Sequence, residues 1–199
     1  MAVIVVGISG ASGVILGFRL AKWLARERHT VELVISRDAP LTAVEEMGKA
    51  FSSAKRIYEQ FSREERSYIR LHPFQDFGAP IASGSFPVHA CVIIPCSMAT
   101  LAAIASGLSD NLLRRAADVT LKEGRKLVLV PREMPFSAIH LENMLKLARL
   151  GASIIVPQPT WYTQPKSIED VEDGILGKVL DVLGIEHTLC PRWGYTADR

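Results

Sequence analysis

A run of small residues directly follows the first apolar segment of the chain and has the composition of an anion-binding turn. Residues 2–8 are apolar apart from one glycine, the next five are Ser9-Gly10-Ala11-Ser12-Gly13, and a helical pattern begins at about residue 13. Glycine lets the backbone approach a ligand closely, and a helix N-terminus offers free N–H groups to an anion. The pattern therefore predicts that a phosphate-bearing molecule binds at this turn.

The turn differs from two common nucleotide-binding motifs. A G-x-G-x-x-G fingerprint needs a glycine where the chain has Ile8, and no Lys-Ser/Thr pair follows Gly13 as it would in a P-loop. The acid that binds an adenosine ribose would end the second strand, but Ser36 and Arg37 stand there instead. A hydroxyl and a cation suit a phosphate better than a ribose diol. A strand–helix turn without a ligand is the alternative interpretation.

Two further hydroxyl groups, those of Ser97 and Thr100, open a predicted helix after the apolar segment 90–94. Hydroxyls in such positions cap the helix, bind a phosphate, or do both. Both interpretations stay open for this segment alone. Ligand contact is favoured when the segment is considered together with the glycine turn and Ser36.

An arginine and a glutamate follow another apolar strand and stand between two prolines. Arg132 and Glu133 lie between Pro131 and Pro135. Prolines stiffen a loop, so both side chains would be held in place with little entropy left to lose. The guanidinium can bind an anion through its fixed fork of donors, and the carboxyl can act as a general acid or base. A surface ion pair is the alternative.

Four more positions could contribute to anion binding, although each signal is weaker. Arg115 and Lys122 are seven residues apart on an amphipathic pattern, which is typical of a solvated cationic face unless a neighbouring subunit brings a ligand there. Tyr162 lies in a proline-rich loop and Lys178 lies one helix later, where the two could bind a second anionic substrate. His140 is interpreted as a structural histidine.

These groups follow apolar segments that alternate with helical patterns. Segments that are apolar at every position are typical of parallel strands covered on both faces. The expected fold is therefore α/β, a three-layer sandwich with a Rossmann-like doubly wound parallel sheet, in which the polar loops after the strands converge at one edge. Strands are expected at 2–8, 31–35, 90–94, 126–130 and 152–156, and helices at about 13–27, 38–49, 52–66, 97–105, 110–123, 137–149 and 167–182.

Composition narrows the class of protein. The chain has 199 residues, of which 48% are hydrophobic and 22% charged, and these values predict one soluble globular domain spanning 1–199. A net charge of +2 is too small to indicate nucleic acid or an anionic membrane as a partner. Three cysteines without C-x-x-C spacing, and no leader sequence before the first strand, favour a cytoplasmic location. The histidine spacing indicates no metal site.

The ordered set of motifs resembles the UbiX-type flavin prenyltransferases, a family within the flavin-containing cysteine-decarboxylase-like proteins. The resemblance extends over essentially the whole chain. It rests on Gly10-Ala11-Ser12-Gly13, Ser83-Gly84-Ser85, Pro95-Cys96-Ser97, residues 111–122, Val130-Pro131-Arg132-Glu133-x-Pro135, His140-Leu141-Glu142-Asn143-Met144, Tyr162 and Pro191-Arg192-Trp193.

The resemblance implies a metal-independent transferase. Such enzymes join a dimethylallyl group, taken from dimethylallyl monophosphate or in some members the diphosphate, to N5 and C6 of reduced FMN. The product, prenylated FMN, passes to a UbiD-type decarboxylase. The resemblance also implies a homo-dodecamer with active sites between subunits.

Roles are carried over by position. FMN contacts are implied for Gly10, Ala11, Ser12, Ser36, Ser97, Met98, Ala99, Thr100 and Arg132. Donor-phosphate contacts are implied for Lys122, Tyr162 and Lys178, and catalytic roles for Ser12, Glu46 and Glu133. Glu45 is adjacent to Glu46, so the choice between them stays open. Lys178 stands where some relatives carry arginine, which keeps the charge but loses the fork of donors.

Two other functions are compatible with this fold. One is an FMN-dependent decarboxylase of a cysteinyl substrate, but such enzymes typically carry a catalytic histidine in the region that here spans Ser36 to Gly48, which contains none. The other is a non-enzymatic carrier that binds FMN without turnover. If FMN binding did not change when the Glu133 carboxylate was removed, the carrier function would be favoured.

Overall fold

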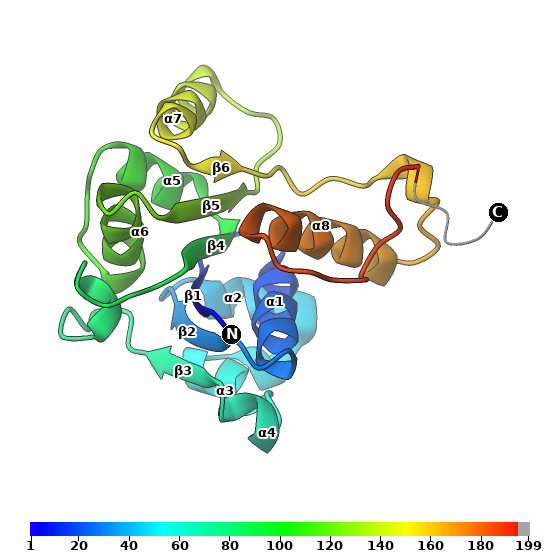
Figure 1. Ribbon diagram of the computed structural model, residues 1–199, viewed down its shortest axis with the longest axis horizontal. Coiled ribbons are helices and arrows are strands. Elements are labelled where there is room, and N and C mark those ends of the chain that lie inside the picture. The colour runs from blue at the N-terminus through cyan, green and yellow to red at the C-terminus, as the bar shows by residue number, and fades with distance from the viewer. Residues whose placement is uncertain (195–199) are drawn as a thin grey trace.

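The computed structural model describes residues 1–194 and contains a single six-stranded sheet in the order β3-β2-β1-β4-β5-β6 (Figure 1). Every neighbouring pair of strands is parallel. The strands are β1 (Val3–Ile8), β2 (Thr30–Ile35), β3 (Ile69–His72), β4 (Ala90–Cys96), β5 (Lys126–Pro131) and β6 (Ser153–Ile154). This arrangement confirms the predicted Rossmann-like parallel sheet.

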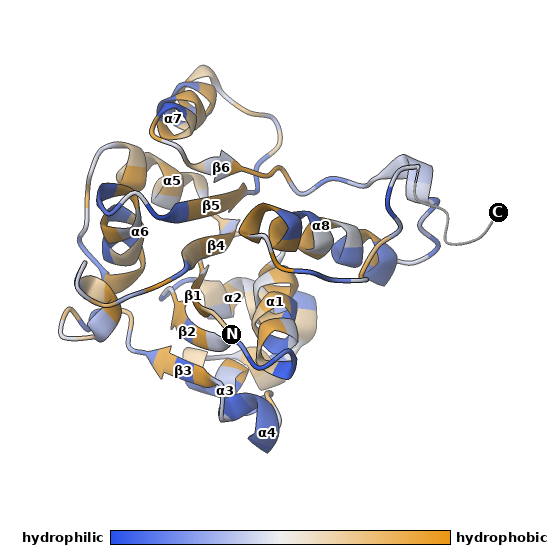
Figure 2. Cartoon of the chain, viewed as in Figure 1, coloured by the Kyte–Doolittle hydropathy of each residue, from blue (hydrophilic) through white to orange (hydrophobic). Residues whose placement is uncertain are grey.

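Helices cover both faces of the sheet, as the apolar strands predict. The helices are α1 (Val14–Arg26), α2 (Ala39–Met47), α3 (Ala54–Glu59), α4 (Arg63–Arg66), α5 (Met98–Ala105), α6 (Leu112–Lys122), α7 (Ala138–Arg149) and α8 (Ile168–Leu183). One hydrophobic cluster joins the sheet to α1, α2, α3 and α8, and a second joins it to α5, α6 and α7. Figure 2 shows apolar residues concentrated on the strands between these layers.

The side chains of β1 point alternately to the two faces of the sheet, which explains why helices must cover both faces. Ile4, Val6 and Ile8 point into the first cluster, whereas Val5 points into the second, and all four are buried. Successive side chains of a strand point to opposite faces, so a strand that is apolar at every position can be stable only between two layers.

Two predicted elements differ from the structure. The sequence does not predict strand β3, because Ile69-Arg70-Leu71-His72 is short, has polar residues at two of its four positions and lies at the edge of the sheet. The single helix predicted at 52–66 is two short helices, each started by its own serine cap: Ser53 accepts from Arg56 N, and Ser62 accepts from Glu65 N. Cap residues inside an apolar-periodic stretch mark such breaks.

Helix α1 lies unusually close to the sheet at Gly17. A Cβ atom at this position would overlap the carbonyl oxygen of Ile94 and would lie 2.7 Å from Ile8 Cγ1. Gly17 therefore sets the distance between α1 and strands β1 and β4, and thereby the place of the turn that precedes the helix.

Two of the three cysteines, Cys91 and Cys96, lie on the central strand β4. Burial raises the pKa of the Cys91 thiol to about 12, and it raises the pKa of Cys96 further. Both groups are therefore thiols at neutral pH and unsuited to act as nucleophiles. Nowhere in residues 1–194 is a helix sufficiently long and apolar to cross a membrane.

Candidate functional site

Four polar loops lie side by side at the carboxyl edge of the sheet, as the topology predicts. Backbone hydrogen bonds join each loop to the next. Ser36 N–H donates to Ile8 O (2.8 Å), Ser9 N–H to Pro95 O (3.2 Å), and Arg132 N–H to Cys96 O (3.2 Å). The loops after β2, β1, β4 and β5 thus form one continuous surface.

Ser9, to which the sequence assigned no role, connects the glycine turn to the loop after β4. Its hydroxyl donates to Pro95 O at 2.9 Å and accepts from Ser97 N–H at 2.7 Å. The side chain is buried, so these bonds satisfy its polar atom in the interior. A small polar residue at the end of an otherwise apolar strand was the signal for this role.

Ser97 caps helix α5. Its hydroxyl accepts from Thr100 N–H at 3.2 Å and donates to Thr100 Oγ1 at 3.0 Å. The capping interpretation is therefore confirmed. Met98 and Ala99 form the first turn of the same helix, and Ala99 is exposed at the site edge. Contact of these residues with a ligand stays a prediction.

The N-terminus of α1 is bonded to a carboxyl side chain of the protein itself. Gly13 N–H donates to Glu46 Oε1 at 2.8 Å, and Val14 N–H donates to Glu46 Oε2 at 3.0 Å. These two N–H groups are therefore bonded within the protein. The contact also distinguishes Glu46 from its neighbour Glu45, which makes no such bond. Contact of the glycine turn with a phosphate-bearing ligand stays a prediction.

The residues that precede this helix start are closely packed. A Cβ atom at Gly10 would lie 2.7 Å from Asp38 Cβ, so a glycine is required where the loops after β1 and β2 meet. Ala11 and Ser12 are half-buried beside it. In the part of the chain that the structure describes, the Ser12 hydroxyl has no protein partner and can bind a ligand.

Ser36 provides a test of whether the site fits a flavin nucleotide. Its side chain is buried, with 8% relative exposure, and among residues 1–194 its Oγ has no hydrogen-bond partner. Buried hydroxyls are nearly always paired, so an unpartnered one at a sheet edge fits a polar ligand that supplies the missing bond. The hydroxyl-rich chain and phosphate of FMN offer such groups, and the residues present therefore fit FMN.

Arg132 and Glu133 are both exposed in the loop between β5 and α7. Glu133 Oε1 accepts from Met134 N–H at 3.1 Å. Within the described residues the two side chains form no ion pair with each other, so the alternative interpretation as a surface ion pair is wrong. Both groups are available to a ligand at this edge.

A second group of predicted residues surrounds a separate cavity. Tyr162 and Lys178 line a cavity of about 430 Å³, together with Trp193 and Arg192. The rings of Tyr162 and Trp193 meet edge to face, with centroids 4.9 Å apart. Arg192, which the sequence did not single out as a ligand-binding residue, is held by Asp181 at 2.9 Å.

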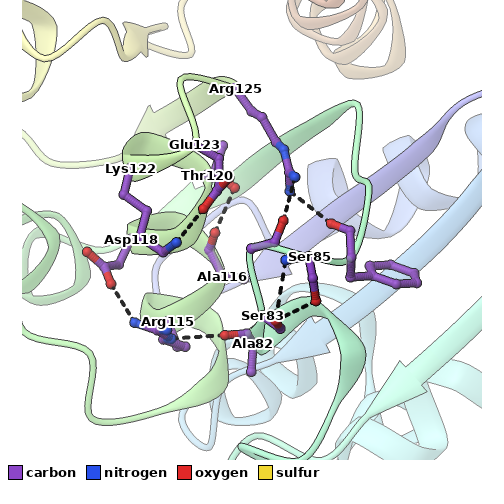
Figure 3. A network of polar contacts seen from close by, with 12 residues as sticks. Ala82, Ser83, Ser85, Arg115, Ala116, Asp118, Thr120, Lys122, Glu123 and Arg125 are labelled. Carbon is purple, nitrogen blue, oxygen red and sulfur yellow. Dashed lines mark hydrogen bonds and ion pairs between the residues drawn. The ribbon is translucent and has the colours of Figure 1, made fainter.

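Lys122 is not brought to either group within one chain. It ends α6, and β5 begins just after it, so it lies toward the amino edge of the sheet, opposite Arg132. Figure 3 shows Lys122 paired with Glu123, and Arg115 bound to Ala82 O (3.0 Å) and to Asp118 (2.9 Å). Among residues 1–194, no group of three His, Cys, Asp or Glu side chains is arranged to hold a metal ion.

The strand order and the polar carboxyl edge define a doubly wound nucleotide-binding protein. The family model described as Flavoprotein matches residues 2–189. The chain is 51% identical to the flavin prenyltransferase UbiX of Chlamydia pneumoniae over 190 residues, which cover 95% of this chain and 96% of the relative. The chain belongs to the flavoprotein family and, within it, to the UbiX flavin prenyltransferases.

Solved structures agree with this assignment. AnUbiX (PadA1), crystallised with FMN and dimethylallyl pyrophosphate, superposes with a TM-score of 0.86 at 39% identity over 98% of both chains. A dodecameric FMN-dependent UbiX-like decarboxylase from Escherichia coli O157:H7 superposes with a TM-score of 0.84 at 42% identity, over 98% of this chain and 100% of the other.

Proposed function

We propose that this protein transfers a dimethylallyl group from dimethylallyl phosphate to N5 and C6 of reduced FMN. The observation that carries the proposal is the buried hydroxyl of Ser36, which has no partner within residues 1–194 and lies on a continuous edge of polar loops. Family membership supports the same function, since close relatives are flavin prenyltransferases.

The acceptor is reduced FMN, which supplies the two ring atoms that become bonded to the allyl group. The residues assigned to it are Gly10, Ala11, Ser12, Ser36, Ser97, Met98, Ala99, Thr100 and Arg132. Most lie on the loops that the backbone bonds hold together, so the site is organised before the ligand binds.

The donor phosphate is assigned to Lys122, Tyr162 and Lys178. Breaking the allyl–phosphate C–O bond leaves negative charge on the phosphate, and cationic side chains aimed at that charge lower the barrier. Ser12 and Glu133 exchange protons with the phosphate and the acceptor. Glu46 assists by holding the turn that carries Ser12 through its two backbone bonds. Trp193 supplies an apolar wall that keeps water from the reacting carbon.

The position of Lys122 supports an assembly in which one chain completes the site of another. The dodecameric structural relative supports the same assembly, and we assign this chain to a homo-dodecamer. The product passes to a UbiD-type decarboxylase. Three free cysteines support a reducing, cytoplasmic location. We assign the chain to a single flavoprotein domain, as its length and composition predict.

Anaerobic incubation with reduced FMN and dimethylallyl monophosphate is expected to yield a flavin heavier by one prenyl unit. Mass spectrometry of the released flavin measures the product, and a parallel incubation with the diphosphate determines which donor is used. A folded, FMN-saturated protein that leaves the flavin mass unchanged with both donors would contradict the proposed function.

Mixing two inactive variants is expected to restore prenyl transfer if Lys122 acts on a neighbouring chain. Lys122→Ala and Ser12→Ala each lose one essential group, but a mixed oligomer contains sites in which both groups are intact. The rate is measured after the two variants are dissociated and reassembled together.

The matched control mixes Ser12→Ala with Glu133→Gln. Both residues lie at the carboxyl edge of the same chain, so this mixture is expected to stay inactive. If the mixture of Lys122→Ala with Ser12→Ala regained no prenyl transfer, Lys122 would act in the site of its own chain. This conclusion would hold whether or not the control mixture regained activity.

A further inference from the structure

The segment that follows α8 turns back along that helix and brings an arginine to the cavity of Tyr162 and Lys178. Figure 1 shows this segment, in red, running beside α8 toward the loop that precedes the helix. Arg192 lines the cavity of about 430 Å³ together with Tyr162 and Lys178. One acidic residue, Asp181, is among the lining residues. The cavity therefore combines two cations, a phenol and one carboxylate.

Asp181 holds the Arg192 guanidinium and is itself held by a histidine. Asp181 Oδ1 lies 2.9 Å from Arg192 Nη2 and 3.1 Å from His187 Nε2. Leu189 N–H donates to His187 Nδ1 at 3.2 Å, so Nε2 carries the proton that Asp181 accepts. Burial opposes ionisation of Asp181, but the hydrogen bonds from Arg192 and His187 hold its pKa below the usual value. The carboxylate is thus ionised at neutral pH, and its charge is compensated by these two donors.

Two packing contacts fix the segment on either side of Arg192. A Cβ atom at Gly177 would lie 2.7 Å from Cys190 Sγ, so the segment lies directly on α8 at this glycine. Just beyond Arg192, the ring of Trp193 meets the ring of Tyr162, with centroids 4.9 Å apart. The arginine is therefore held over the cavity by its neighbours in sequence as well as by Asp181.

The guanidinium has donors left for a ligand after it has bonded to Asp181. A guanidinium carries five N–H groups, and this bond uses one of them. Within residues 1–194 the polar contacts of Arg192 are made by Nη2 alone, and Nε and Nη1 have no hydrogen bond. Arginine binds phosphate through two parallel N–H groups, whereas lysine acts as a point charge. Arg192 can therefore supply the directed bonds that Lys178 lacks.

We propose that Arg192 binds the phosphate of the allyl donor beside Tyr162 and Lys178, and that Asp181 is a positioning residue that holds the Arg192 guanidinium at this cavity. The inference rests on the proposed function, because it adds a residue to the donor site. Negative charge that develops on the leaving phosphate then meets two cations of this chain, one of which offers a fixed fork of donors.

The test measures the dissociation constant of dimethylallyl monophosphate by calorimetry. The protein holds oxidised FMN in place of the reduced acceptor, so that binding is measured without transfer. Arg192→Gln is expected to weaken donor binding roughly tenfold, as loss of a hydrogen bond to a charged group does. Inorganic phosphate that competes with the donor should lose affinity by a similar factor. Affinity for FMN is expected to change less than about twofold, as for any change confined to the donor cavity.

Arg63→Gln is the matched control, because Arg63 is an exposed arginine on α4 and does not line the cavity. It removes the same charge and is expected to leave donor affinity within about twofold. Adding Lys178→Arg to Arg192→Gln returns a guanidinium to the cavity and is expected to recover donor affinity by about threefold or more. A purely structural role of Arg192 would not respond to the change at Lys178.

A double-mutant cycle tests the positioning role of Asp181. Asp181→Ala alone is expected to weaken donor binding by about threefold or more, because Arg192 loses its anchor. In the Arg192→Gln background, Asp181→Ala is expected to cause no further loss, since no guanidinium remains to be held. An equal loss in both backgrounds would overturn the positioning role and would show that Asp181 acts independently of Arg192.

Donor affinity of Arg192→Gln within twofold of the unmodified protein would overturn the inference. A tenfold loss in Arg63→Gln would do the same, because the effect would then come from net charge. Arg192→Lys keeps the charge and can still bond to Asp181, so it serves as a second variant if Arg192→Gln does not fold. Unchanged donor affinity in Arg192→Lys would also contradict a role for the fork. Failure of the proposed function would be distinct: the unmodified protein would bind the donor but leave the mass of reduced FMN unchanged.

Discussion

Replacing Glu133 by glutamine is expected to lower the rate of prenyl transfer by about 100-fold or more, which is the range for loss of a general acid or base. Affinity for FMN is expected to stay the same. Glutamine keeps the size of the side chain and can still accept from Met134 N–H, so the loop should hold its conformation. What is lost is the group that exchanges a proton. Single-turnover rates with reduced FMN and dimethylallyl monophosphate measure the effect.

Glu142→Gln is the control for this experiment, because Glu142 is an exposed carboxylate on the following helix, α7, outside the proposed site. Its rate is expected to match that of the unmodified protein. Equal rates for Glu133→Gln and the unmodified protein would remove Glu133 from the catalytic group. If the unmodified protein also showed no turnover, the remaining function would be that of a flavin carrier.

Replacing Gly17 by alanine is expected to lower the free energy of unfolding by about 3 kcal/mol, the upper part of the range for overpacking a core. The added methyl group would overlap the Ile94 carbonyl oxygen, which cannot move without shifting strand β4, and would press on the side chain of Ile8. Alanine's better helix propensity, worth about 1 kcal/mol, offsets only part of this cost. Urea unfolding at fixed protein concentration measures the change.

The matched control is Gly174→Ala in helix α8. Within residues 1–194, a Cβ atom there would meet only Thr160 Oγ1, at 3.9 Å, which is an ordinary contact distance. This variant is expected to gain about 0.5–1 kcal/mol through helix propensity. Equal stability of the two variants would show that α1 can move away from the sheet at Gly17.

The core strands and most helix starts could be predicted because their signals are local. Segments such as Leu127-Val128-Leu129-Val130 are apolar at every position, and serine or asparagine caps mark where helices begin, as at Ser97, Asn111, Ser137 and Ser167. Strand β3 could not be predicted in this way. Its Arg70 and His72 are unfavourable in an isolated buried strand, and they become suitable only beside Glu32 on the neighbouring strand.

In the candidate site, too, some features could be predicted from local sequence signals and others could not. Residue types and strand ends predicted which loops meet, since right-handed crossovers place all carboxyl ends of parallel strands at one edge. They did not predict that Glu46 fills the helix start at Gly13, that Ser9 joins two loops, or that Lys122 lies away from the other site residues of its own chain.

By itself, the sequence determined a parallel α/β sheet with polar loops along one edge, because strand burial, helix caps and connection handedness depend on near neighbours and general chirality. Only the tertiary structure decided which of those polar groups are satisfied by the protein and which are left for a ligand. In the described part of the chain, Glu46 and Ser9 have hydrogen-bond partners, whereas the Ser36 hydroxyl has none. That outcome depends on side chains far apart in the sequence meeting at hydrogen-bond distance, and no local pattern encodes it.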